Sequence, residues 1–213
     1  MIIGVDFDNT IICYDHLFHR VAREQGMIPE DLPADKQQIR DYLRRTGRED
    51  LWTEMQGYVY GERIVEAEPF PDVREFFLFC RERELAVCIV SHKTRHPYLG
   101  RKQDLHAAAY KWLTLQGFFD PDRLGLSRAR VFFELTKEEK INRIAALQCT
   151  HFIDDLPEFL SEKSFPPAVR RFLFDPRGNH LSGHPFPRIA SWRDIRETFT
   201  TLLDVAPLRD ASQ

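Results

Sequence analysis

Short apolar runs that do not alternate with polar residues constrain the fold of this chain more than any other feature. Four are clear and a fifth is a candidate: Ile2–Val5, Ala86–Val90, Phe152–Ile153 with its flanks, Phe172–Phe174, and the candidate Val131–Phe133. Strands of this kind are buried on both faces, as in a parallel sheet that helices cover. Amphipathic helices separate the runs; in Val73–Cys80, for example, apolar residues recur at i, i+3, i+4 and i+7. The alternation predicts an α/β fold: a doubly wound, Rossmann-like parallel sheet of five strands flanked by helices.

One segment of the 213-residue chain, residues 15–68, breaks this alternation. It has helical periodicity without a convincing strand, and Pro69 and Pro71 close it. We interpret it as a small all-helical cap, inserted directly after the first strand. The predicted domains are therefore an α/β core of residues 1–14 and 69–213 and a helical cap of residues 15–68.

The charge balance excludes several classes of protein. Thirty basic against thirty-three acidic residues give a net charge of −3, without the uniform positive field typical of dedicated nucleic-acid binders. No apolar run approaches the roughly 18 residues of a membrane span, and no basic leader stands at the start. The four cysteines are far apart and lack zinc-ligand spacing. We expect a cytoplasmic protein without nucleic-acid or membrane partners; the sequence leaves its oligomeric state open.

Two carboxylates follow the first buried strand directly, in the sequence Val5-Asp6-Phe7-Asp8-Asn9-Thr10. The carboxyl ends of strands are where open α/β sheets bind ligands. Like charges this close together repel, so they are costly unless a cation or a shared proton compensates them. The pattern therefore favours a ligand or metal site over a structural turn.

Three further groups are expected at the same edge of the sheet. Ser91 supplies a hydroxyl at the end of a buried strand, and Lys137 and Lys140 begin the helix before another strand. That strand ends in a second acidic pair, Asp154-Asp155. Four acids, a hydroxyl and an ammonium at adjacent strand ends predict a magnesium site with room for a phosphate.

In this order, the residues resemble the haloacid dehalogenase superfamily, in its phosphatase form. The resemblance rests on the D-x-D-N-T run, the apolar strand ending in Ser91, the lysine and the I-D-D run, and it covers essentially the whole chain. It implies a hydrolase that cleaves phosphoric monoesters with Mg²⁺ as cofactor, through an aspartyl-phosphate intermediate. A cap of the small helical type implies a small phosphorylated metabolite as substrate.

The resemblance also implies roles for the acids. Asp6 resembles the nucleophile, and Asp8 the general acid that becomes the base for the hydrolytic water. Dehalogenases of the superfamily lack an acid at the second position, so Asp8 favours a phosphatase. Magnesium is expected on an Asp6 oxygen, the main-chain carbonyl of Asp8, and the acidic pair. Asp155 is favoured as the direct ligand, with Asp154 orienting a ligand water.

The remaining site residues follow from the same resemblance. Ser91 is expected to donate to a phosphoryl oxygen, and Asn9 and Thr10 belong to the signature, with Thr10 supporting the loop. His92 is a further candidate for substrate binding. A lysine is expected to pair with the nucleophile and the phosphate; Lys140, followed by an apolar residue, fits the family pattern better than Lys137, but its short spacing to the acidic pair leaves Lys137 open.

Alternatives remain beside this interpretation. A phosphotransferase, a phosphoprotein or nucleotide phosphatase, and a catalytically silent binding scaffold are the other candidate functions. Phosphonate cleavage through a Schiff base would need a lysine in the cap, where Lys36 is the only one and stands in a polar context. Four cap arginines interleave with acids, as on a solvated helix face, and are also candidates for gripping an anionic substrate: Arg40, Arg44, Arg45 and Arg48.

Overall fold

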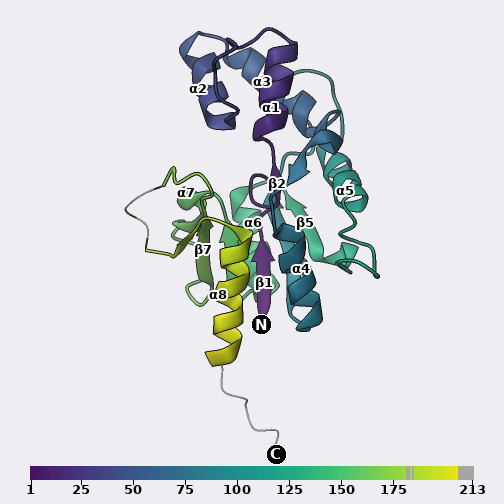
Figure 1. The fold of residues 1–213 in the computed structure, drawn as a ribbon, viewed down its shortest axis with the longest axis vertical. Coiled ribbons are helices and arrows are strands. Elements are labelled where there is room, and N and C mark those ends of the chain that lie inside the picture. The colour runs from purple at the N-terminus through teal and green to yellow at the C-terminus, as the bar shows by residue number, and fades with distance from the viewer. Residues whose placement is uncertain (181–182, 184, 206–213) are drawn as a thin grey trace, which may run out of the picture.

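A computed structural model describes residues 1–180, 183 and 185–205 of the chain. Its main sheet is parallel throughout, with the strand order β5-β4-β1-β6-β7-β8 (Figure 1). The strands are β1 (Ile2–Val5), β4 (Ala86–His92), β5 (Val131–Glu134), β6 (His151–Asp154), β7 (Arg170–Phe174) and β8 (Arg188–Ile189). The predicted α/β fold is confirmed, but the predicted number of five strands is wrong: there are six. The added edge strand β8 has two residues, too few to form an apolar run that a sequence could reveal.

Helices cover both faces of this sheet. The helices of the described residues are α1 (Asp15–Glu24), α2 (Lys36–Arg45), α3 (Glu49–Tyr60), α4 (Val73–Glu82), α5 (Leu105–Leu115), α6 (Lys137–Ala146), α7 (Pro157–Leu160) and α8 (Trp192–Val205), with 3-10 turns at Ile64–Glu66 and Arg128–Arg130. Of these, α4 to α8 lie on the faces of the sheet. Alternate residues of β4 show the two layers: Ile89 packs in the cluster that holds α4, α5 and α8, and Val90 in the cluster that holds α6 and α7. No helix in these described ranges has the length and apolar character needed to cross a membrane.

The central strand β1 places the start of the site. It pairs with β4 on one side and β6 on the other, and Ile3 and Val5 are fully buried. Between them, Gly4 is needed for space, because a Cβ there would lie 2.5 Å from the Phe152 ring. The chain that leaves β1 therefore emerges from the middle of the sheet at its carboxyl edge.

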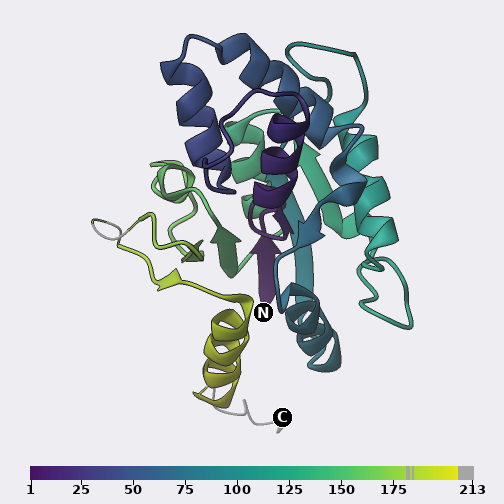
Figure 2. The same cartoon turned by 45° about the horizontal axis from the view of Figure 1, so that its top comes forward.

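The insert, residues 15–68, contains helices α1, α2 and α3 and lies above the carboxyl ends of the strands (Figures 1 and 2). A short antiparallel ribbon of β2 (Ile12–Cys13) and β3 (Glu68–Pro69) joins it to the rest. The three helices pack on one another, with the rings of Phe18 and Trp52 5.0 Å apart. Their apolar residues belong to the same cluster as one face of the sheet. The predicted helical content is thus observed, while the division into a core and a separate cap remains a prediction. Residues 181, 182, 184 and 206–213 of the predicted core lie outside the described part.

His151, the first residue of β6, makes the stability of this fold depend on pH. Its ring stacks on Phe172 with centroids 6.0 Å apart and meets the ring of Phe199 at 5.2 Å. Burial, together with the charges of Arg170 and the N-terminal amine, lowers the pKa of His151 from 6.5 to about 4. Between these values the unfolded chain binds more protons than the folded one, so the free energy of unfolding falls as the pH falls through this window.

We expect His151→Phe to remove this part of the acid sensitivity. The phenyl ring keeps the stacking but does not titrate, so the wild type should lose about 1–2 kcal/mol more than the variant between pH 6.5 and 4, a range reduced because the ring is partly exposed. Denaturant unfolding at several pH values measures the difference. The exposed His16, substituted in the same way, is the control; equal slopes for His151→Phe and the wild type would contradict the prediction.

Candidate active site

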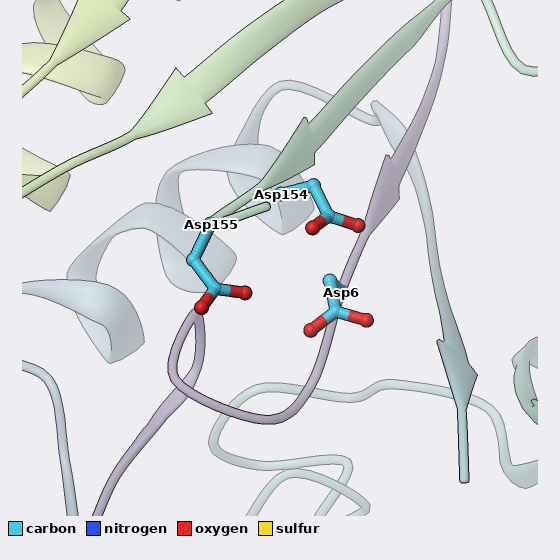
Figure 3. A group of neighbouring side chains, drawn as sticks. All are labelled: Asp6, Asp154 and Asp155. Carbon is cyan, nitrogen blue, oxygen red and sulfur yellow. The ribbon is translucent and has the colours of Figure 1, made fainter. Parts of the chain in front are cut away.

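Three carboxylates meet at the carboxyl ends of β1 and β6. One oxygen from each of Asp6, Asp154 and Asp155 lies within 4.8 Å of the others (Figure 3). Asp6 directly follows β1, and Asp154 ends the neighbouring strand β6, so the register of these two strands brings them together. Asp6 and Asp154 are buried and Asp155 is partly exposed. The sequence placed these acids at one sheet edge, and the structure brings them together.

Lys140 joins two of these acids. Its buried Nζ lies 2.6 Å from Asp6 Oδ1 and 2.6 Å from Asp154 Oδ2. Burial would lower the pKa of Lys140, but the charges of Asp154 and Asp6 outweigh it and raise this pKa, so the side chain is an ammonium. Lys137, the open alternative from the sequence, is exposed on the first turn of α6.

A capping box fixes which lysine faces the sheet. The Thr136 hydroxyl accepts from the Glu139 N–H at 3.0 Å, and a Glu139 carboxylate oxygen accepts from the Thr136 N–H at 3.0 Å. This pairing sets the first turn of α6, one turn before Lys140. The direction of Lys140 therefore follows from local sequence, as the S/T-x-x-E pattern allows.

The two acids of the second pair differ in what they contact. Asp154 Oδ2 accepts from Lys140, and Asp154 Oδ1 accepts from the Leu156 N–H at 2.9 Å. Asp155 accepts from the Thr10 hydroxyl at 3.4 Å, and no ion pair within the described residues reaches it. Both oxygens of Asp154 therefore have partners, whereas Asp155 keeps one carboxylate oxygen without a partner among the described residues.

The electrostatics of this cluster favour a cation. Burial and the charges of Asp154 and Asp6 raise the pKa of Asp155 well above its usual value. Burial and Asp6 also raise the pKa of Asp154 to about 7, despite Lys140. One ammonium thus faces three carboxylates, and a hard divalent ion would relieve the repulsion. The oxygen donors present therefore fit Mg²⁺, which Asp6, Asp155 and the Asp8 carbonyl would hold.

Asp8 has a second lysine of its own. Lys93 Nζ lies 2.9 and 2.8 Å from the two oxygens of Asp8, and the Tyr14 hydroxyl donates to Oδ1 at 2.7 Å. Burial would raise the pKa of Asp8, but Lys93 and Tyr14 outweigh it and lower this pKa. Lys93 is not among the site residues predicted from the sequence. Its position two residues after Ser91, on the period of an extended strand, was the available signal.

These groups line one cavity of about 360 Å³. The predicted residues on its wall are Asp6, Asp8, Asn9, Ser91, His92, Lys140 and Asp155. Ser91 is buried near the end of β4, whereas the His92 side chain is largely exposed and its ring contacts the Leu135 carbonyl at 3.1 Å. Asn9 adopts a left-handed backbone, with φ of 58°. Thr10 lies beneath Asp155, as its hydrogen bond shows, rather than on the cavity wall.

The insert contributes a lysine to this cavity, and none of the four candidate arginines lies on its wall. Lys36 and Tyr60 are on the cavity wall, while Arg44 pairs with Glu49 at 2.7 Å on the surface. Arg45 and Arg48 lie over the Tyr42 ring instead. Arg40 pairs with Asp41 and reaches only a neighbouring cavity. Three of the four arginines therefore behave as a solvated helix face.

Comparison with solved structures shows which proteins share this fold. A HAD-superfamily hydrolase of Ehrlichia chaffeensis has a TM-score of 0.56 at 12% identity, with 94% of this chain and 96% of that chain covered. The HAD-hydrolase YfnB of Bacillus subtilis, bound to magnesium, gives 0.58 at 15%, covering 92% and 97%. A HAD phosphatase of Thermococcus onnurineus gives 0.50 at 16%, covering 92% and 96%. No protein-family model and no curated protein matches the sequence. The chain has the fold of the haloacid dehalogenase superfamily of hydrolases.

Proposed function

We propose that this protein is a magnesium-dependent phosphatase that hydrolyses a small phosphorylated metabolite through an aspartyl phosphate on Asp6. One observation carries the proposal: two carboxylates, the buried Asp6 and the partly exposed Asp8, line the same cavity and each has its own lysine. Asp6 Oδ1 is held by Lys140, and no hydrogen bond from a described residue reaches its other oxygen. That oxygen is therefore available as a nucleophile.

In the first step, an Asp6 oxygen attacks phosphorus, and the bond from phosphorus to the ester oxygen breaks. Lys140, 2.6 Å from the other Asp6 oxygen, offsets the negative charge that gathers on the phosphoryl group. Ser91, buried on the cavity wall, is placed to donate a hydrogen bond to a phosphoryl oxygen. Bound magnesium would neutralise further charge between the phosphate and the acids.

Asp8 transfers a proton in each of the two steps. It gives a proton to the leaving alcohol, and in the second step it takes one from the water that releases phosphate from Asp6. The contacts with Lys93 and Tyr14 keep Asp8 ionised, which is the form needed to accept that proton. To act as the acid, Asp8 has to gain a proton when the ester binds, and the Lys93 contact has to loosen.

The choice of a small substrate rests on the insert. Its helices lie above the carboxyl edge of the sheet, and the cavity of about 360 Å³ suits a metabolite rather than a protein surface. A phosphotransferase would use the same first step with another acceptor than water. A dehalogenase would have no proton to supply to its leaving group, and so no use for Asp8 and its two partners.

Magnesium should stabilise the protein through Asp155. Binding to the folded state at about 100 times the Kd contributes about 2.7 kcal/mol, seen as a higher Tm. Asp155→Asn should abolish this increase, even though it relieves repulsion in the metal-free protein. Substitution of the exposed Asp122 with Asn is the matched control.

Calcium should also bind but support little turnover, because its looser oxygen shell lets it hold both Asp6 oxygens. Full activity in chelator would contradict the metal requirement.

A rapid-mixing experiment with p-nitrophenyl phosphate should distinguish the proposed roles of Asp6 and Asp8. Its leaving group needs no proton, so Asp8→Asn should still release a burst of nitrophenolate that approaches the enzyme concentration, followed by turnover about 10²–10⁴-fold slower than in the wild type. Asp6→Asn should give no burst, because an amide does not attack phosphorus. Asp31→Asn, on the surface, should match the wild type. A burst from Asp6→Asn, with deamidation excluded by mass spectrometry, would refute the nucleophile assignment.

A further inference from the structure

Lys36 is the charged side chain by which the insert reaches the catalytic cavity. It is the first residue of α2, and it lines both the main cavity and a neighbouring one of about 150 Å³. Its Nζ lies 5.3 Å from the centre of the Tyr60 ring and between 5 and 6 Å from the rings of Tyr14 and Phe18. Three aromatic rings thus surround an ammonium at the boundary between two cavities.

The charges in the cavity leave Lys36 without a carboxylate of its own. Lys140 is occupied by Asp6 and Asp154, and Lys93 by Asp8. No ion pair of Lys36 occurs within the described residues. Burial would lower the pKa of Lys36, but Tyr60 and the more distant Asp8 and Asp155 raise it, so it stays charged. Lys36 is partly exposed, so its ammonium is only partly removed from solvent and has no paired carboxylate, and a ligand anion would compensate its charge.

Contacts at the start of α2, which extend to Arg177 in the α/β core, fix the position of Lys36. Asp35 caps α2 by accepting from the Gln38 N–H at 2.9 Å, and Asp15 accepts from the Lys36 N–H at 2.9 Å. Arg177, in the loop after β7, forms ion pairs with both Asp15 and Asp35. The core therefore anchors the start of α2, so that Lys36 is held in place before a ligand arrives.

We propose that Lys36 binds an anionic group on the alcohol portion of the substrate, so that the preferred substrates are phosphomonoesters with a second negative charge, from a carboxylate or a second phosphate. This inference rests on the proposed phosphatase function. Lys140, Ser91 and the acidic cluster already serve the reacting phosphoryl group. Lys36 lies beyond them, where the neighbouring cavity gives the alcohol portion room.

Three phosphomonoesters of similar size test the inference. Phosphoglycolate and ethylene glycol bisphosphate carry a second anionic group, and hydroxyethyl phosphate carries a hydroxyl in its place. The wild type should prefer at least one of the first two, and which one identifies the anion as carboxylate or phosphate. Lys36→Met, which keeps an apolar chain among the rings, should lower kcat/KM for the preferred anionic probe by about 10²-fold. The loss on hydroxyethyl phosphate should stay below about threefold. Lys111→Met, exposed on α5, is the control.

Each result has a distinct meaning. An equal loss on the probes with and without a second anionic group would overturn the inference, because Lys36 would then serve the phosphoryl group or the fold. Wild-type turnover without preference for a second charge would overturn it as well, while leaving the phosphatase function standing. Absence of turnover on every probe, including p-nitrophenyl phosphate, would overturn the proposed function and the inference together. If Lys36→Met has a lowered Tm, Lys36→Gln and Lys36→Arg repeat the comparison, and only the arginine should retain the charge preference.

Discussion

The contact of Lys140 with Asp6 and Asp154 is the interaction on which the site depends. Two buried carboxylates on adjacent strands would repel each other in a poorly solvated place, and this ammonium, 2.6 Å from each, holds them together. Removing one partner of such a buried set typically costs about 3–5 kcal/mol, because it leaves an uncompensated charge. Three elements have to be in register for the contact to form: β1, β6 and the first turns of α6. The fold and the site are therefore specified by the same contact.

Among the described residues, Asp8 forms an ion pair with a lysine whereas Asp155 forms none, and this difference underlies the roles proposed for the two acids. Lys93 and Tyr14 lower the pKa of Asp8, whereas burial and its acidic neighbours raise the pKa of Asp155. An acid with a lowered pKa remains a carboxylate that handles protons, and one with a raised pKa gains most from a bound cation. The proposed assignment of proton transfer to Asp8 and metal binding to Asp155 rests on this difference.

Residues of the insert and residues at the ends of the strands together line the cavity. Tyr14, the residue directly before the insert, donates to Asp8, and its ring centre lies 4.9 Å from that of Tyr60 at the end of α3. Arg177 binds the insert from the opposite side through two aspartates. These contacts tie the helices of the insert to Asp8 on one side and to the loop after β7 on the other.

Local pattern was enough to predict much of this protein. Buried strands appear as unbroken apolar runs, and an acid or hydroxyl directly after such a run lies at the carboxyl edge of the sheet; this located Asp6, Ser91 and the pair that includes Asp155. The start of α6 is likewise encoded locally, in a capping box of four residues. The preference for Lys140 over Lys137 rested on the family pattern and left Lys137 open. The α/β class followed from the alternation of strands and helices.

Contacts between distant segments decided the rest. Lys93 lies 85 positions from Asp8, and Lys36 begins a helix whose apolar pattern marks only the buried Ile39 and Leu43, so neither partnership leaves a local pattern. The arginine-rich stretch left open a solvated helix face or anion binding, and short-range pairs such as Arg44 with Glu49 place it on the surface. Strand β8 has two residues and exists because β7 offers it a partner. Sequence by itself determined which residues stand at the ends of buried strands; the tertiary structure decided which charges face each other, because pairing across a cavity depends on packing far along the chain.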